Sequence, residues 1–160
     1  MRNISALLPE DEQGIAMLHL TRNNGLITVT RQSTLYLARS IGIGINQLRA
    51  FKENENKEEK IEDDFGSTSQ YANALENIML EVQRSLDYYE RHSSNPPIST
   101  LVITPIQEEL PGFVEYFMSK NLGLQVNVLD LNSVIECDRS VSTILQTRCL
   151  FTIGAALRNG

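Results

Sequence analysis

The chain has 160 residues, and a domain of this length buries about 70% of its unfolded surface, so one core is expected without help from disulfide bonds. Hydrophobic residues make up 41% of the chain and charged residues 21%, a composition that excludes an intrinsically disordered protein. The formal net charge of -6 argues against nucleic acid or an anionic membrane surface as a direct partner, because both require clustered Lys and Arg.

No apolar run approaches the roughly 18 residues that span a bilayer, and the first ten residues lack the features of a signal peptide. We therefore expect a cytoplasmic protein that reaches a membrane only through another protein. Cys137 and Cys149 lie outside any CxxC arrangement and are interpreted as reduced thiols. His19 and His92 are too far apart in sequence to suggest a metal site.

The first part of the chain predicts an antiparallel meander. Residues 1–9 are expected to be the frayed end of a helix that Pro9 stops. Strands are predicted at 15–20 and 26–30, joined by a type I′ turn at Asn24 and Gly25, because an Asn-Gly pair tolerates the positive φ of that turn. A third strand is predicted at 35–41, ending at Gly42 and Gly44.

Residues 52–66 are rich in Glu and Asp and are predicted to form a solvated or partly disordered insertion. An acidic metal site is the alternative interpretation. The acids lack the spacing and the glycine of a calcium-binding EF-hand loop, which disfavours that alternative.

A long helix is predicted from a cap among Ser67, Thr68 and Ser69 to His92, where Asn95-Pro96-Pro97 ends it. Ser67 and Gln70 have the spacing of a capping box. Arg84 and Arg91 are expected to pair with Asp87 on the solvent side. The apolar stripe expected to face the core comprises Tyr71, Leu75, Ile78, Val82, Leu86 and Tyr89.

The remaining elements alternate between strand and helix. Strands are predicted at 98–104 and 124–129, the first covered on both faces because it is almost continuously apolar. Between them, a helix is predicted from Pro111 to Gly123. Its expected buried residues are Val114, Phe117 and Met118.

The last helix is predicted to be capped by Asp138 or Ser140. Its packing surface is expected to comprise Val141, Ile144, Leu145 and residues 153–157, with Gly154 permitting close approach. The order βββαβαβα indicates a single α/β domain over residues 1–160, with a mixed sheet and helices on its faces.

This order, with an insertion after the third strand, resembles the ribonuclease H-like half of the actin superfamily. Three segments are similar to the PilM family: residues 80–90 to its "EIQRSLDYYE" helix, 35–44 to its third strand, and 154–158 to its closing "GLALR" motif. The similarity spans nearly the whole chain. Residues 95–99 most resemble the branch that serves the mannose-sensitive haemagglutinin (MSHA) pilus.

The resemblance implies a cytoplasmic component of the inner-membrane platform for a type IV pilus, bound to the tail of a PilN-like or MshJ-like membrane protein. It leaves homo-oligomerisation open. Actin-like proteins have two such halves, so we expect the chain to be the C-terminal half of a longer protein.

Four positions bear on nucleotide binding. In the superfamily, the hairpin after the first strand carries an Asp-x-Gly signature, and those positions fall on His19 and Thr21. A Gly-Gly pair follows the next-to-last strand, where this chain has Thr104 and Pro105. A neutral imidazole does not replace an oxygen ligand of Mg²⁺, and side chains now occupy positions where bare backbone approaches the nucleotide.

We therefore expect no nucleotide, no cofactor and no catalysis. The sequence has no Walker A, GxSxG or HExxH motif. Asp87 and Asp130 are interpreted as a helix-face ion pair and a strand-end cap. Two alternatives stay open: an ATPase half-domain completed by a second half, and a GspL-like cytoplasmic domain of type II secretion.

Overall fold

The computed structural model describes residues 1–58, 69–106, 110, 112–120 and 123–158. Its centre is a mixed five-stranded sheet in the order β3-β2-β1-β4-β5. The strands are β1 (Ile15–Leu20), β2 (Gly25–Arg31), β3 (Thr34–Ile41), β4 (Thr100–Ile103) and β5 (Gln125–Val128). The predicted meander and the two later strands are therefore confirmed. β1, β2 and β3 pair antiparallel, whereas β1, β4 and β5 run parallel to one another.

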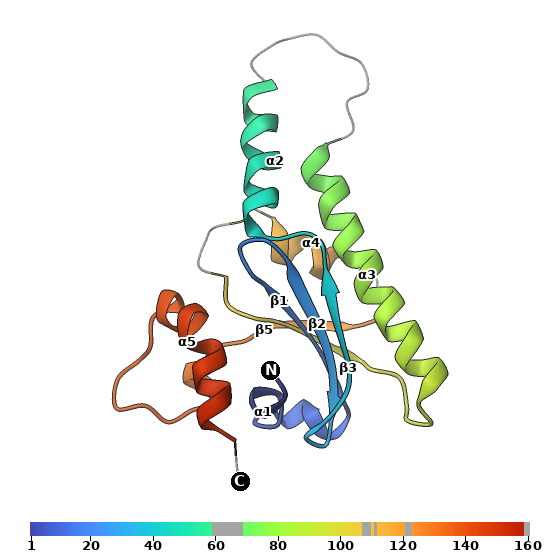
Figure 1. Ribbon diagram of the computed structural model, residues 1–160, viewed down its shortest axis with the longest axis vertical. Helices are drawn as coiled ribbons and strands as arrows, with labels where there is room; N and C mark the ends of the chain where they lie inside the picture. The colour runs from blue at the N-terminus through green and yellow to red at the C-terminus, as the bar shows by residue number, and fades with distance from the viewer. Residues whose placement is uncertain (59–68, 107–109, 111, 121–122, 159–160) are drawn as a thin grey trace.

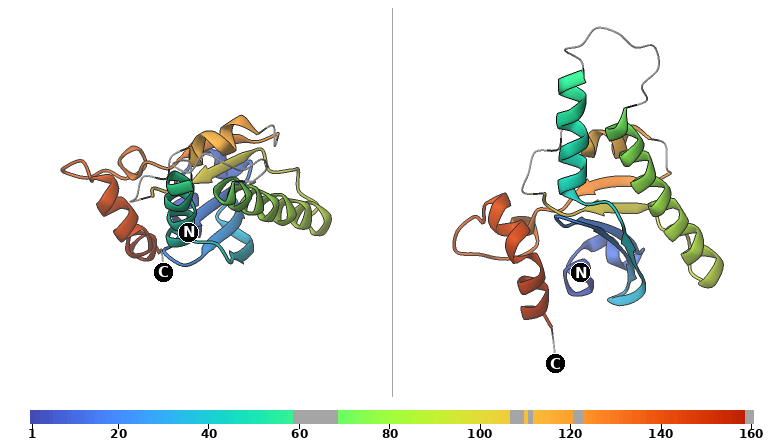
Figure 2. Two further views of the ribbon diagram at one scale, coloured as in Figure 1. Left: turned by 90° about the horizontal axis from the view of Figure 1, so that it is seen from above. Right: turned by 45° about the horizontal axis from the view of Figure 1, so that its top comes forward.

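Helices cover both faces of the sheet. One face packs against α2 (Ile45–Glu58), α3 (Gln70–His92) and α4 (Phe113–Ser119). The opposite face packs against α1 (Arg2–Ser5) and α5 (Thr143–Ala156). Figure 1 shows α3 and α5 on opposite sides of the sheet, and both views in Figure 2 agree. Short 3₁₀ helices lie at η1 (Pro9–Glu12) and η2 (Leu131–Ser133).

The apolar stripe predicted for α3 is confirmed, since all six of its residues are buried. The helix begins at Gln70, and the Ser69 side chain accepts a hydrogen bond from the N–H of Ala72. Ser67 and Thr68 lie outside the described residues. Arg84 pairs with Glu81 rather than with the predicted Asp87, and Glu81 also pairs with Arg39 of β3. These contacts attach α3 to the edge strand β3.

The sequence-based prediction for residues 52–66 is wrong in its first part. Residues 52–58 belong to α2, and residues 59–66 fall outside the described part of the chain. Ile45 and Leu48 are buried, at helical spacing, and anchor the start of α2 on the sheet. Farther along, the Glu55 carboxylate accepts hydrogen bonds from the N–H of Tyr71 and the hydroxyl of Ser69, which ties α2 to the start of α3.

The predicted type I′ turn is also misplaced. β1 and β2 pair from Leu20 to Gly25, so four residues connect them and Gly25 belongs to the strand. The two-residue turn lies between β2 and β3, where Gln32 and Ser33 have φ of 48° and 59°. The N–H of Ser33 donates to the Asp11 carboxylate, a tertiary contact that helps to hold this unusual backbone.

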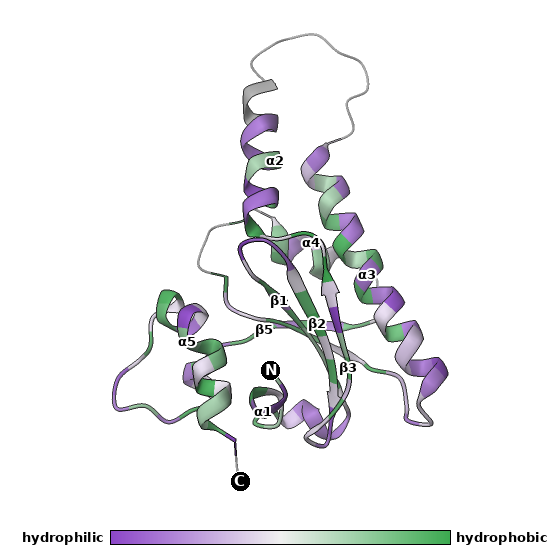
Figure 3. Cartoon of the chain, viewed as in Figure 1, coloured by the Kyte–Doolittle hydropathy of each residue, from purple (hydrophilic) through white to green (hydrophobic). Residues whose placement is uncertain are grey.

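The chain start is packed rather than frayed, because Ile4 is fully buried and Gly154 of α5 lies against it. The face predicted for α5 is wrong in its first part, since Ile144 and Leu145 are 48% and 51% exposed. Its second part is confirmed, because Ile153, Gly154 and Leu157 pack against the core. The buried residues of α5 are Gln146, Leu150 and Gly154, and the helix starts after Ser142 rather than after Asp138 or Ser140. Figure 3 shows hydrophobic residues around much of α5.

α4 also differs from its prediction. Its buried residues are Phe113 and Phe117, whereas Met118 is 55% exposed. The helix begins after Gly112 and ends before Gly123, and Pro111 lies outside the described residues. Within the described part of the chain, no helix is both long and apolar enough to cross a lipid bilayer.

Candidate functional site

The sheet brings the four nucleotide-related positions to one edge. β1 and β4 are parallel with Leu18 beside Ile103, and β4 and β5 are parallel with Ile103 beside Val128. The carboxyl ends of the three strands therefore meet, which is where open α/β sheets commonly bind ligands. His19 and Thr21 lie at the end of β1, and Thr104 and Pro105 directly follow β4.

His19 contacts Thr104 directly. The imidazole Nδ1 lies 2.9 Å from the Thr104 hydroxyl, and the ring makes an edge-on contact with Phe151 at 4.9 Å between centroids. The side chain is 4% exposed. Burial lowers the pKa of His19 to about 4, so the ring is neutral at pH 7. These are the surroundings of a packed structural histidine, and they join β1 to the segment after β4.

Thr21 closes the β1–β2 hairpin on itself. Its N–H donates to the carbonyl of Asn24 at 2.8 Å, and its hydroxyl oxygen accepts from the N–H of Asn24 at 3.2 Å. The hydroxyl also lies 2.6 Å from the Asn24 side-chain oxygen. Phosphate-binding loops rely on free backbone N–H groups, and here the N–H groups of Thr21 and Asn24 are bonded inside the loop.

The start of α2 covers the same hairpin. The N–H groups of Ile45 and Asn46 donate to the carbonyls of Thr21 and Arg22, each at 2.9 Å. These groups belong to the helix N-terminus, the part of a helix that commonly binds anions. The approach requires glycine at position 44, because an added Cβ would lie 2.4 Å from the backbone carbon of Asn23. The hairpin and α2 thus satisfy each other's backbone groups.

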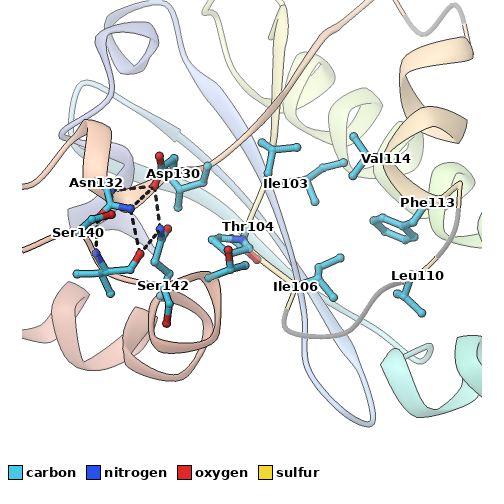
Figure 4. A pocket seen from close by; sticks show the side chains of 16 residues that line it. Ile103, Thr104, Ile106, Leu110, Phe113, Val114, Asp130, Asn132, Ser140 and Ser142 are labelled. Atoms are coloured by element: carbon cyan, nitrogen blue, oxygen red, sulfur yellow. Dashed lines mark hydrogen bonds between the residues drawn. The ribbon is translucent and has the colours of Figure 1, made fainter.

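A cavity of about 560 Å³ opens beside Thr104 and Pro105, at the ends of β4 and β5. Figure 4 shows its two sides, with Thr104 between them. One side is apolar and is formed by Ile103, Ile106, Leu110, Phe113 and Val114. The other side is polar and is formed by Asp130, Asn132, Ser140, Ser142, Thr143 and Gln146.

Asp130 and Gln146 organise the polar side. The Gln146 amide donates to the Asp130 carboxylate at 2.8 Å and to the carbonyl of Val141 at 3.0 Å, and its oxygen accepts from the N–H of Leu131 at 2.8 Å. Hydrogen bonds from the backbone of Asn132, then from Gln146, hold the pKa of Asp130 below its usual value. Asp130 therefore caps η2, as the predicted strand-end cap requires, and carries a negative charge at neutral pH.

The charged groups of the cavity lining bear on whether a nucleoside polyphosphate and its metal ion could be held there. Its lining contains one carboxylate and no basic side chain among the described residues, so phosphate oxygens would find no cation to pair with. The Pro105 carbonyl already accepts a hydrogen bond from Thr147 at 3.1 Å. No cluster of three or more metal-binding side chains occurs in the described ranges.

The other residues considered from sequence do not join this site. His92 stacks on Tyr88 at the end of α3, with ring centroids 4.0 Å apart. Cys137 is exposed and Cys149 is half-buried in α5. Sequence reasoning recognised the cap at Asp130 but missed Gln146, because one glutamine in a helix gives no signal of the loop it will satisfy. It also missed the role of the α2 N-terminus.

Solved structures are similar to the chain over nearly its whole length. A PilM-PilN type IV pilus biogenesis complex matches 97% of this chain and 48% of that chain, with a TM-score of 0.57 and 14% sequence identity. The ethanolamine utilization protein EutJ from Carboxydothermus hydrogenoformans matches 99% of this chain and 53% of that chain, with a TM-score of 0.53 and 17% identity. The chain spans about half the length of these structures.

No protein-family model matches the chain, and no curated protein matches its sequence. The structural likeness nevertheless confirms the predicted fold class: the mixed sheet with helices on both faces is that of a ribonuclease H-like half of an actin-like protein.

Proposed function

We propose that the chain is a non-catalytic scaffold component of the inner-membrane platform that assembles a type IV pilus, in the manner of MshI-like proteins of MSHA pili. The observation that carries this proposal is the closed hairpin. The N–H groups of Thr21 and Asn24 bond inside the hairpin, and the N–H groups of Ile45 and Asn46 at the α2 N-terminus bond to hairpin carbonyls, so these donors are not free for a phosphate. The fold is thus retained, while residues at the carboxyl ends of its strands, where the nucleotide-related positions lie, bond to one another. This is expected of a domain that positions partners.

The partner in this proposal is the cytoplasmic tail of a PilN-like or MshJ-like membrane protein, which would hold the protein at the inner membrane from the cytoplasmic side. Support comes from the fold shared with the PilM-PilN complex and from the family-like segments at residues 80–90 and 154–158. Because the chain spans about half of that structure, we assign the contact with the tail to the full-length protein and to no particular surface of this chain.

We expect the full-length protein to bind a synthetic peptide of the cognate PilN-like or MshJ-like tail in isothermal titration calorimetry. A scrambled peptide of the same composition serves as the control and should give no heat of binding. Equal heats for both peptides would contradict the proposed partner. Selective binding to the tail of a type II secretion platform protein would instead favour the GspL-like alternative.

One observation favours the alternative of an ATP-binding half, namely the cavity of about 560 Å³ at the strand ends. We expect Mg-ATP to leave the melting temperature of the full-length protein unchanged, because the cavity offers no cation and the hairpin N–H groups of Thr21 and Asn24 are bonded. A ligand present at 100 times its dissociation constant stabilises a protein by about 2.7 kcal/mol. A rise of several degrees with millimolar Mg-ATP, but not with Mg²⁺ alone, would establish the ATP-binding alternative.

A further inference from the structure

The outer edge of β5 presents free backbone groups. β5 is the last strand in the order β3-β2-β1-β4-β5. The N–H groups of Gln125 and Leu129 donate to the carbonyls of Ser99 and Ile103 beside β4, at 2.7 and 2.8 Å. Alternate residues of a strand direct their backbone groups to opposite sides, so Val126 and Val128 direct theirs away from the sheet.

This edge lacks two common protections against pairing with another chain. Exposed edge strands are commonly blocked by charged side chains or proline, and the β5 sequence Gln-Val-Asn-Val has neither. The opposite edge strand, β3, carries Arg39, which pairs with Glu81 of α3 at 3.0 Å. β5 is therefore the edge strand without a charged side chain.

An apolar groove of about 550 Å³ follows the β5 edge. Met118 of α4 and Val128 of β5 line it and are 55% and 50% exposed. Val126 and Val128 share one face of the strand, because side chains two residues apart point the same way. Leu8 and Val134 line the groove on the side of η1 and η2.

The groove has acidic borders. Glu10 of η1 and Asp130, just after β5, are its charged lining residues, and no basic side chain lines it among the described residues. The whole chain has a formal net charge of -6, so its long-range field also attracts cationic segments. The groove therefore combines apolar residues with two acidic residues, Glu10 and Asp130, at its borders.

We propose that an extended polypeptide segment with alternating apolar and basic side chains docks along β5 as a sixth strand. Its backbone pairs with Val126 and Val128. Because the side chains of a strand alternate, its apolar residues face Met118 and Val128 while its basic residues face Glu10 and Asp130. A symmetric pair of copies would place the same acidic border on both sides of the interface, which disfavours a second copy as the occupant. This inference does not depend on the proposed function.

The test uses two fluorescent eight-residue peptides, one alternating valine with lysine and the other alternating valine with glutamate. Their binding to the full chain is measured by fluorescence anisotropy. We expect the lysine peptide to bind at least tenfold more tightly. Val128→Lys should weaken its binding at least tenfold, because a cation then occupies the groove. Leu145→Lys adds the same charge at an equally exposed position on α5 and should leave affinity unchanged.

Hydrogen exchange supplies the readout for strand pairing. The lysine peptide is expected to slow exchange of the backbone amides of Val126 and Val128, which face the outer edge, and not those of β3. Equal affinity of the two peptides, unchanged binding by the Val128→Lys protein, or binding without protection of β5 would each overturn the proposal. A dimer of the wild-type chain that Val128→Lys dissociates would overturn it in favour of self-association.

Discussion

Gly44→Ala is expected to lower the free energy of unfolding by about 3 kcal/mol, the upper part of the range for overpacking a tightly packed site. An added Cβ would lie 2.4 Å from the backbone carbon of Asn23 and 2.5 Å from the nitrogen of Asn24. Backbone atoms of the hairpin cannot rotate away as a side chain would. To relieve the clash, α2 must move, which breaks the hydrogen bonds from Ile45 and Asn46 to the hairpin carbonyls.

Gly42→Ala is the matched control. It lies two residues earlier in the same connection, and an added Cβ there would meet no atom within 4 Å. Urea unfolding of the two variants should differ by about 3 kcal/mol, which corresponds to about 6–12 °C in melting temperature for a chain of this size. Similar unfolding curves for both variants would show that the hairpin and α2 do not meet as closely as described.

The second large effect concerns pH and His19. Burial lowers its pKa from 6.5 to about 4, so the folded protein keeps the ring neutral while the unfolded chain takes up a proton below pH 6.5. The unfolded state then binds more protons, and stability falls as the pH falls from about 6.5 to about 4. A difference of 2.5 pKa units corresponds to a loss of about 3 kcal/mol, complete near pH 4.

His19→Gln isolates this contribution, because glutamine can still hydrogen-bond to the Thr104 hydroxyl but does not titrate. Carboxylates titrate in both proteins and cancel in the comparison. Urea unfolding is measured for both proteins at pH 7, 6, 5 and 4. The free energy of unfolding of the wild type, relative to that of the variant, should fall by about 3 kcal/mol between pH 7 and pH 4. Parallel pH profiles would mean that His19 is protonated, or exposed, in the folded protein.

The spacing of apolar residues along the sequence predicted most of the fold. The stripe from Tyr71 to Tyr89 is apolar at every third or fourth position, and burial follows from that spacing alone. The segment of β4 is almost continuously apolar, which predicted that it is covered on both faces, and all four of its residues are buried. These predictions succeeded because the spacing of apolar residues within one helix or strand determines which of its faces is buried.

The prediction for α2 failed because composition was given more weight than periodicity. The acidic residues after Lys52 suggested a solvated segment, yet Ile45 and Leu48 already had helical spacing and are both buried. Farther along α2, Glu55 bonds to the start of α3 rather than to solvent. An acidic side chain near a helix N-terminus is stabilised by unpaired N–H groups, and sequence gives no sign of which helix will supply them.

The candidate site was predicted in part. His19, Thr21, Thr104 and Pro105 were chosen by resemblance to motif positions, and the sheet does bring them to one edge. Their partners could not be predicted. The hydrogen bond between His19 and Thr104 joins residues that are 85 positions apart, and Gln146 accepts from the N–H of Leu131, which lies 15 positions earlier. Such contacts depend on the register of parallel strands.

The sequence by itself determined the five strands, the helices α3 to α5, the two-sided burial of β4 and the apolar face of α3, because hydrophobic periodicity acts over a few neighbouring residues. Only the tertiary structure decided that Gln32 and Ser33 form the tight turn, that Gln146 and Leu150 rather than Ile144 and Leu145 are buried in α5, and that α2 covers the hairpin. Each of these outcomes satisfies a polar group or fills a space supplied by a distant segment, and that complement exists only once the chain has folded.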